Sequence, residues 1–569
     1  MVCIPRKNIT SDERLGDLLD KCIRNPPDND AIVYVDRDIR LSWREWGIEV
    51  DRVAKGMMAM GIQKGEKVAV WATNVPDWIT LMFATAKIGA IMLTINTNYR
   101  SAELDYVLRQ SDMENLFLID GVRDVDYVQT VYDLVPELKT QPRDSFHSEK
   151  YPHLRRVVHL GPEKHRGMYS MNEVKSLACQ TSDEEYQERK DSVDVHDVTM
   201  MQYTSGTTGF PKGVMLTHFN IANDGYWVGA NMNYGPTDRL CLNVPLFHCF
   251  GCVLGVMACI NHGVTMCFVE VFDPIKVMTT IETEKCTAVY GVPTMFISIL
   301  NNKLFDKFDF SSLRTGIMAG SPCPIKTMEE VVDKMNMKEI TIVYGLTEAS
   351  PGMTQTTYDE PSIEKKCSSV GKRLQGVDTV ILDPDTNEPC PDGVIGEFCC
   401  KGYNVMKGYY KMPEETAKII DSNGYLHSGD LGYRDSEGYF YVTGRIKDMI
   451  IRGGENIYPK EIEEFIYTHP AVKDVQVIGV PDKKYGEEAM ACIILKEPGS
   501  VTVEEMLDYI KASMARHKVP KYIDFVDAFP MNAAGKILKY KMREEATERF
   551  GLEGAAGIDT AQTAEQMKR

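Results

Sequence analysis

The sequence predicts an α/β protein with a large N-terminal part of helix-covered sheets, a barrel-like subdomain and a small α+β domain at the C-terminus. Three observations predict this fold class. Helix-like and strand-like periodicities alternate over residues 42–120. Short alternating strands, separated by Pro, Gly and Asp turns, occupy residues 371–410, and the pattern changes to a smaller α+β unit past Arg445. A chain of 569 residues is also too long for one ordinary core, so several domains are expected.

The spacing of apolar residues places the first elements in chain order. It predicts helices at 43–60, at 78–88 and from Ser101 onward, with strands at 67–71, 90–95 and 116–119. Residues 121–195 are polar and weakly periodic, which predicts loops and short helices on the surface. The core pattern resumes in strands at 198–203, 288–293 and 315–321.

The C-terminal unit shows its own alternation of elements. Helices are predicted at 461–469 and 503–515, and strands at 472–480 and 489–495. We therefore expect a large N-terminal domain at 1–446 and a small C-terminal domain at 447–550. Residues 551–569 are rich in Ala, Gly, Thr and Gln, which predicts a disordered tail.

The composition is that of a soluble globular protein, with 43% hydrophobic and 26% charged residues. The net charge of −18 argues against a nucleic-acid partner, because the neutralisation of phosphates needs a basic face. Any site for an anionic ligand must therefore be locally basic.

The fifteen cysteines are scattered through apolar runs, which predicts buried core residues in a reducing compartment rather than a disulfide framework. Cys249 and Cys252 have C-x-x-C spacing, but no second pair accompanies them, so the core interpretation is favoured. Residues 1–20 lack the apolar stretch of a signal peptide, and the most apolar run, 253–268, is too short to cross a bilayer. We expect a cytoplasmic protein with at most peripheral membrane contact.

The most informative segment is YTSGTTGFPKG, from Tyr203 to Gly213, which follows a strand-like run. Glycines let backbone N–H groups converge on an anion, hydroxyls add donors, and Lys212 adds a compact positive charge. This combination predicts a polyphosphate cradle, and the alternative is a solvated Ser/Thr/Gly turn. The spacing differs from a Walker A loop, and residues 214–216 are strand-like rather than helical. The candidate phosphate ligands are Thr204, Ser205, Gly206, Thr207, Thr208, Gly209 and Lys212.

This loop and several other segments resemble the motifs of the adenylate-forming superfamily, which includes acyl-CoA synthetases, aryl-CoA ligases, adenylation domains and firefly-type luciferases. The resemblance runs from about Leu41 to Lys541, and the motifs keep the expected order. The other segments are PLFHCFG at 245–251, GSP at 320–322, YGLTE at 344–348, SGD at 428–430, GRIKD at 444–448, RGGENIYP at 452–459 and PMNAAGK at 530–536.

The resemblance implies ATP, Mg²⁺ and CoA as ligands. It assigns adenine stacking to Tyr344, a phosphate contact to Thr347, Mg²⁺ to Glu348 and the ribose hydroxyls to Asp430, with Arg445 assisting. These roles suit the residue types, because aromatic rings pack on flat ligands and a carboxylate offers two oxygens to vicinal hydroxyls or to a cation. The implied nucleotide site also includes Gly345 and the turn Gly320, Ser321 and Pro322.

The same resemblance implies that the C-terminal domain is mobile about a hinge at Lys447. Lys536 is the implied catalytic lysine, because adenylation brings a carboxylate to the α-phosphate and a bridging cation offsets the repulsion between the two anions. Gly453, Gly454 and Tyr485 are implied to line the pantetheine tunnel of CoA. The further residues expected to act in catalysis are Thr204, Lys212, Glu348 and His248.

The acid substrate is predicted from the pocket-wall motif. His248 stands where amino-acid adenylation domains carry an aspartate, which argues against an α-amino acid. Gly345 stands where acetate-specific relatives carry a tryptophan, which predicts room for a longer acyl group. The expected pocket wall is apolar at Phe250, Leu254, Met318 and Met353, and His248 and Gly345 are its other expected members.

The overall resemblance is closest to medium-chain fatty acyl-CoA synthetases, so we expect an AMP-forming enzyme for a medium-chain or longer fatty acid. Four alternatives stay open: an aryl-CoA ligase, a stand-alone adenylation protein that loads a carrier-protein thiol, a nucleotide sensor without turnover and, more remotely, a light-emitting enzyme. The joint presence of Lys212, Glu348, Asp430 and Lys536 argues against the sensor. The sequence does not predict the oligomeric state.

Overall fold

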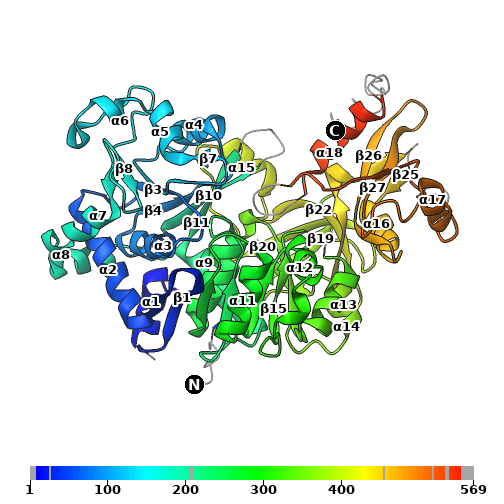
Figure 1. Ribbon diagram of the computed structural model, residues 1–569, viewed down its shortest axis with the longest axis horizontal. Coiled ribbons are helices and arrows are strands. Elements are labelled where there is room, and N and C mark those ends of the chain that lie inside the picture. The colour runs from blue at the N-terminus through cyan, green and yellow to red at the C-terminus, as the bar shows by residue number, and fades with distance from the viewer. Residues whose placement is uncertain are drawn as a thin grey trace.

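The computed structural model describes residues 8–24, 27–205, 211–321, 323–452, 455–514, 518–531 and 537–552. Figure 1 shows two large sheets with helices between and around them, and a C-terminal unit, coloured orange to red, at one end of the molecule. The α/β class with a small α+β C-terminal unit, predicted from the sequence, is confirmed.

The first large sheet has eight strands in the order β21-β11-β10-β4-β3-β5-β8-β9. Strands β10, β4, β3, β5 and β8 run parallel, and β11 returns antiparallel to β10. The strands are β3 (Lys67–Trp71), β4 (Ile91–Thr94), β5 (Asn115–Leu118), β8 (Arg156–His159), β9 (Tyr169–Ser170), β10 (Val198–Ser205), β11 (Pro211–Thr217) and β21 (Gly408–Tyr409).

The second large sheet has nine strands in the order β18-β17-β16-β15-β14-β12-β13-β1-β2. The six strands from β16 to β1 in this order are parallel. The strands are β1 (Asp30–Tyr34), β2 (Ile39–Ser42), β12 (Arg239–Leu242), β13 (Thr265–Phe268), β14 (Ala288–Gly291), β15 (Thr315–Ala319), β16 (Glu339–Gly345), β17 (Gly352–Gln355) and β18 (Lys372–Arg373).

Helices fill the space between the two sheets and cover their outer faces, because a parallel sheet buries both faces. The central core joins Trp43, Trp78 and Ile221 from the middle helices to Val68 and Leu240, one from each large sheet. The middle helices are α1 (Leu15–Arg24), α2 (Trp43–Ala59), α3 (Pro76–Ile88), α9 (His218–Asn231), the π-helix η4 (Phe250–Met257) and α10 (Ala258–His262). The first sheet is covered outside by α4 (Ser101–Gln110), α5 (Tyr127–Leu134) and α6 (Glu137–Thr140), and the second by α11 (Pro274–Glu284), α12 (Pro293–Leu300), α13 (Ile325–Lys334) and α14 (Ile363–Ser368).

The segment expected as a barrel-like subdomain contributes to an open, four-stranded antiparallel sheet in the order β19-β20-β22-β23. Its strands are β19 (Val377–Leu382), β20 (Gly396–Gly402), β22 (Leu426–Arg434) and β23 (Phe440–Arg445), with α15 (Pro413–Ile419) before β22. The short strands β18 and β21 from the same segment pair with the two large sheets instead. This sheet therefore connects the large sheets to the C-terminal unit.

The C-terminal unit has a five-stranded sheet in the order β25-β24-β27-β26, with β28 beside β27. Helices α16 and α17 pack on one face of this sheet and α18 on the other, each burying apolar residues. Helix α16 also contacts β23 of the four-stranded sheet. The elements are β24 (Ile450–Arg452), β25 (Glu455–Ile457), α16 (Pro459–Tyr467), β26 (Val472–Asp482), β27 (Gly486–Leu495), α17 (Val503–Lys511), β28 (Tyr522–Phe525) and α18 (Lys539–Arg549).

The predicted elements between residues 43 and 119 are confirmed to within a few residues. The segment 121–195 differs from its prediction, since it holds β8, which joins the first large sheet and buries Val157 and Val158. Four residues are too few to show a period, and the flanking Arg156 and His159 make the strand look polar. The short helices expected there are present as α5, α6, α7 (Met171–Leu177) and α8 (Asp183–Asp191).

The described cysteines are free, and Cys249 and Cys252 are buried in the central core, which confirms the core interpretation for that pair. Within the described ranges, no helix combines the length and apolar character that a membrane crossing requires. The tail predicted to be disordered lies outside the described residues from position 553 onward.

Candidate active site

Two neighbouring strands of the second large sheet end at the centre of the candidate site. Strands β15 and β16 are parallel, with Ala319 opposite Val343, so the residues that follow β15 lie beside the end of β16. Gly320 turns the chain there with a φ of 89°, a conformation that glycine adopts without strain. The predicted residues Gly320 and Ser321 therefore lie beside Tyr344, at the strand ends where open α/β sheets bind ligands.

Asp430 contacts Tyr344 although 86 positions separate them in the sequence. The Tyr344 hydroxyl donates to Asp430 Oδ2 at 2.9 Å, and Arg445 Nε lies 2.9 Å from Asp430 Oδ1. Asp430 and Arg445 face each other across β22 and β23. Burial and the Asp430 carboxylate raise the pKa of Tyr344 well above its usual value, so the phenol stays a hydrogen-bond donor. The structure thus brings together three residues assigned to the nucleoside.

The turn that carries Asp430 is held by two residues that sequence reasoning missed. Glu397 Oε1 accepts a hydrogen bond from the Gly429 N–H at 2.8 Å, and Glu397 Oε2 lies 2.8 Å from His427 Nδ1. The hydrogen bond to Glu397 raises the pKa of His427. No local pattern marks Glu397, because it reaches the turn from β20, the neighbouring strand.

The predicted phosphate loop joins the hairpin strands β10 and β11, as the strand–loop–strand prediction requires. Thr204 and Lys212 are opposite each other in the register of this hairpin. Lys212 is buried and pairs with Glu415, and its Nζ lies 5.1 Å from the centre of the Tyr409 ring. The Tyr409 hydroxyl donates to Glu348 Oε1 at 2.7 Å. Tyr409 therefore links the predicted phosphate-binding lysine to the predicted Mg²⁺ ligand.

Sequence reasoning missed both Tyr409 and Glu415. Tyr409 is 61 positions from Glu348, and Glu415 is 203 positions from Lys212, so neither contact has a local signal. Burial and the Glu348 carboxylate raise the pKa of Tyr409, which keeps its hydroxyl protonated. Hydrogen bonds from Lys212 and Lys418 lower the pKa of Glu415 to about 2, so this carboxylate is ionised.

The pocket-wall motif lies at the start of the π-helix η4, a helix type that is frequent at functional sites. The Phe250 N–H donates to His248 Nδ1 at 3.1 Å. Because Nδ1 accepts this hydrogen bond, the ring proton of His248 is on Nε2. The Cys249 thiol donates to Thr347 Oγ1 at 3.6 Å, so this motif contacts the YGLTE segment. Three predicted pocket residues, Phe250, Leu254 and Met353, belong to the central core.

The assignment of Met318 to the same pocket is wrong. Its neighbours Ile317 and Ala319 face the central core, whereas Met318 packs in the outer core with α11, α12 and α13. Successive residues of a strand face opposite sides of a sheet. Met318 therefore lies on the other side of the second large sheet from Phe250 and Met353.

The expected open space beside Gly345 also needs correction. Gly345 is exposed, but a Cβ built on it would lie 1.7 Å from Pro351 O. In that direction the space is filled by the backbone of Pro351 and Gly352. Glycine is needed at this position because another part of the chain comes so close, and the pocket depth must be set by other residues.

The predicted hinge lies in a short turn between the four-stranded sheet and the C-terminal unit. Lys447 is exposed in the 3-10 turn η7 (Ile446–Asp448), and Asp448 Oδ1 pairs with Arg543 of α18 at 2.6 Å. The guanidinium carbon of Arg452 lies 4.2 Å from the centre of the Tyr485 ring. Arg452 directly precedes the predicted glycine turn in the sequence.

Several predicted site residues lie outside the described residues, and their roles stay predictions. They are Gly206, Thr207, Thr208, Gly209, Pro322, Gly453, Gly454 and Lys536. The side chain of Ser205 lies outside the description as well.

Comparison of this chain with protein families and with known proteins identifies its relatives. The family model of the AMP-binding enzyme matches residues 19–410, and that of the AMP-binding enzyme C-terminal domain matches residues 461–536. YngI of Bacillus subtilis, which carries the provisional name acyl-CoA synthetase, is 50% identical over 95% of this chain and 98% of its own length. The mitochondrial medium-chain acyl-CoA ligase ACSF2 of Danio rerio is 37% identical over 94% of this chain and 89% of its own length.

A solved structure shows how the parts of such a chain are arranged. ATP-bound MatB of Rhodopseudomonas palustris is 28% identical and superposes with a TM-score of 0.80, over 94% of this chain and 99% of MatB. The apo form of MatB, over the same shares of both chains, superposes with a TM-score of 0.70. The present arrangement is therefore more similar to the ATP-bound form.

Proposed function

This chain belongs to the AMP-binding enzyme family, and from this premise we propose that it is an AMP-forming acyl-CoA synthetase for medium-chain fatty acids. One observation supports the proposal: the segment 344–348 contacts residues on three sides of the candidate site. Its Tyr344 bonds to Asp430, its Thr347 to Cys249 beside the pocket-wall histidine, and its Glu348 to Tyr409. This segment therefore joins the proposed nucleoside, acid and phosphate sides.

In the proposed first step, a carboxylate oxygen of the acid attacks the α-phosphorus of ATP. A new P–O bond forms, the bond to pyrophosphate breaks, and acyl-AMP results. Asp430 accepts the ribose hydroxyls, Tyr344 packs against the adenine, and Lys212 with Thr204 binds phosphate oxygens. Lys536 bridges the two anions and offsets their repulsion, which is the electrostatic part of the catalysis.

Glu348 fits the proposed role of a Mg²⁺ ligand. Its carboxylate is buried, and the Tyr409 hydroxyl holds one of its oxygens at 2.7 Å. Mg²⁺ binds proteins through one or two carboxylates together with phosphate oxygens. When bound, it would neutralise phosphate charge, while Tyr409 orients the carboxylate.

Two observations support a medium-chain fatty acid as the substrate. The relative ACSF2 is named a medium-chain acyl-CoA ligase, and the pocket-wall residues Phe250, Leu254 and Met353 are apolar and buried in one core. Methionine adapts its shape to an alkyl chain at low cost. His248 directly precedes Cys249, whose thiol contacts Thr347, so we place the carboxylate of the acid near His248 and Thr347 and the alkyl chain along η4.

In the proposed second step, the CoA thiolate attacks the acyl carbonyl carbon. A C–S bond forms, the C–O bond to the phosphate breaks, and AMP leaves. We propose that the C-terminal unit turns about Lys447 between the steps, so that Gly453, Gly454 and Tyr485 line the CoA tunnel. The present structure superposes better on the ATP-bound form of MatB than on the apo form. This difference supports the proposal that its C-terminal unit has the position used in the first step.

Separate assays of the two steps test this proposal. Lys536→Ala should lower ATP-dependent acyl-AMP formation by at least about 100-fold, the usual effect of removing one electrostatic stabiliser. The same variant should still convert supplied acyl-AMP and CoA to acyl-CoA. Lys541→Ala, which changes an exposed lysine of α18, is the matched control and should keep both steps. Equal loss of both steps in Lys536→Ala would contradict the two-step account.

A further inference from the structure

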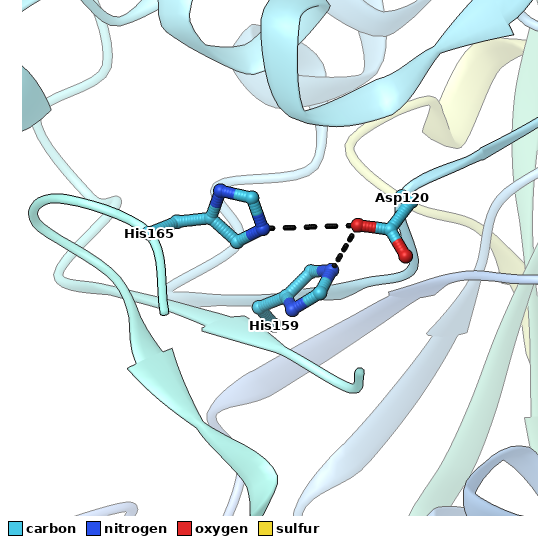
Figure 2. Close-up of side chains that lie close together, drawn as sticks. All are labelled: Asp120, His159 and His165. Atoms are coloured by element: carbon cyan, nitrogen blue, oxygen red, sulfur yellow. Dashed lines mark ion pairs between the residues drawn. The ribbon is translucent and has the colours of Figure 1, made fainter. Parts of the chain in front are cut away.

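Asp120, His159 and His165 meet at the edge of the first large sheet, outside the candidate active site (Figure 2). Asp120 follows β5 and His159 ends β8, and these parallel neighbours place Leu118 opposite His159. His165 comes from the connection between β8 and β9. Because parallel strands end at the same edge, the topology itself brings Asp120 and His159 together. Strands β3 and β4 separate this cluster from the β10–β11 hairpin.

The donor atoms of the cluster have the spacing of metal ligands. Asp120 Oδ1 lies 2.9 Å from His159 Nε2 and 3.7 Å from His165 Nε2, and the three donor atoms lie within 4.8 Å of one another. Ligand atoms around a tetrahedral zinc are about 3.3 Å apart, given bonds of about 2.0–2.1 Å. The two distances lie on either side of this value, so small side-chain rotations would bring the donors onto one ion.

The hydrogen bonding of His159 directs its Nε2 at Asp120. His159 Nδ1 lies 3.3 Å from the Glu163 carbonyl oxygen, which can only accept, so this contact needs the proton on Nδ1. The His159 side chain is 1% exposed, and its Nε2 makes the ion pair with Asp120 drawn in Figure 2 but no hydrogen bond to the described residues. Nε2 is therefore the ring nitrogen that faces the Asp120 carboxylate, and it is the one left to hold a cation, a proton or a metal ion, beside it. Metal-bound histidines characteristically donate their other ring N–H to a carbonyl or carboxylate.

The surroundings leave room for the His159 ring and expose the Asp120 side of the cluster to solvent. A Cβ at Gly161 would lie 2.7 Å from His159 Cε1, so a side chain at that position would displace the ring. The Asp120 side chain is 67% exposed. His165 also lines a cavity of about 480 Å³, together with Arg143 and Glu173. Asp120 and the cavity beside His165 therefore lie on the solvent side of the cluster, whereas the two histidine Nε2 atoms are buried.

We propose that Asp120, His159 and His165 bind Zn²⁺, with water as the fourth ligand. Two imidazole nitrogens and one carboxylate oxygen suit zinc and related transition metals, whereas Mg²⁺ and Ca²⁺ take oxygen ligands. Bound zinc connects the segment 160–168 to the ends of β5 and β8. The site takes no part in the proposed reaction, so its failure and the failure of the proposed function are distinguishable.

Equilibrium dialysis of the EDTA-treated full chain against ZnCl2, in excess MgCl2, tests the proposal. Asp120→Asn and His165→Ala should each bind one zinc equivalent fewer than the wild type, or bind it at least about 100-fold more weakly. His147→Ala, which changes an exposed histidine of the same region, should bind zinc like the wild type. Equal zinc content in the wild type and both ligand variants would overturn the proposal, and so would a wild type that binds no zinc.

A second cluster requires a spectroscopic control, because Glu397, Cys399 and His427 also lie within reach of one ion. Cobalt bound by a thiolate gives a sulfur-to-metal charge-transfer band, which the Asp120 cluster lacks because it has no sulfur. With Co²⁺ as the probe, Asp120→Asn should reduce the visible metal bands without changing any thiolate band. Visible bands unchanged in Asp120→Asn but abolished in Cys399→Ser would assign the metal to the second cluster and overturn the proposal.

Discussion

Replacement of Asp430 by asparagine should weaken ATP binding by about 30-fold and leave the fold intact. The Asp430 carboxylate accepts a hydrogen bond from Tyr344 at 2.9 Å and lies 2.9 Å from Arg445 Nε. Asparagine has nearly the same shape. Its oxygen can face Arg445 and its amide can donate to the phenol oxygen, so the variant loses the charge and keeps the contacts.

The magnitude follows from the two ribose hydroxyls in the proposed site. A hydrogen bond to a charged group contributes about 1.5–3 kcal/mol, and one between neutral groups about 0.5–1.5 kcal/mol. Each hydroxyl therefore loses about 1 kcal/mol, or about 2 kcal/mol in total, which corresponds to a factor of about 30 in the Kd. Isothermal titration calorimetry measures the Kd for ATP, and steady-state AMP release measures KM. The value of kcat should change little, since the ribose is held alike before and during the reaction.

Asp378→Asn is the matched control for this experiment. Asp378 also accepts a hydrogen bond from a tyrosine, Tyr425 at 2.6 Å, and lies 3.1 Å from Arg373. It belongs to β19, at the far edge of the same four-stranded sheet from β23. Its replacement should leave the Kd for ATP unchanged. An unchanged Kd for Asp430→Asn, or an equal effect of both substitutions, would refute the ribose assignment.

Three further predictions concern Tyr409, Gly345 and Asp224. Tyr409→Phe removes the donor to buried Glu348, so urea unfolding should show a loss of about 1.5–3 kcal/mol, and half-maximal AMP release should need more MgCl2. An unchanged MgCl2 requirement would argue against the metal role of Glu348. Gly345→Ala should nearly abolish adenylation, because the new Cβ would lie 1.7 Å from Pro351 O; a normal rate of pyrophosphate release would contradict this reasoning. Burial raises the pKa of Asp224 well above its ordinary value. The contribution of Asp224 to the unfolding free energy is therefore complete below the ordinary pKa, and it is lost as the pH rises toward and through the raised pKa of the folded state. Asp224→Asn lacks this loss, so its unfolding free energy relative to the wild type should increase with pH, and a constant difference would count against a protonated Asp224.

The nucleotide side of the site was predictable because its residues lie in short, contiguous motifs. Strand-like runs on both sides of the glycine-rich loop predicted the strands β10 and β11, which the structure pairs as a hairpin with Thr204 opposite Lys212. The resemblance also implied that Tyr344, Asp430 and Arg445 serve one ligand, and these side chains are in contact. Their roles toward ATP stay predictions.

The remaining errors arise from packing between distant segments. Tyr409 and Glu415 reach Glu348 and Lys212 across long stretches of chain, so no local spacing marks them. The alternation of Ile317, Met318 and Ala319 shows that Met318 faces away from its neighbours, but which face meets the pocket depends on where η4 packs. The space beside Gly345 likewise depends on the backbone of Pro351, which the sequence does not place.

ATP-dependent AMP release, with and without CoA, tests the central claim most directly. The substrates are saturated acids from acetate to palmitate, together with benzoate and a cinnamate. The account predicts CoA-dependent turnover with a maximum at intermediate chain lengths. Turnover confined to aromatic acids would overturn the proposed substrate and keep the chemistry. Absence of AMP with every acid, in a preparation that binds ATP, would contradict the acyl-CoA synthetase account.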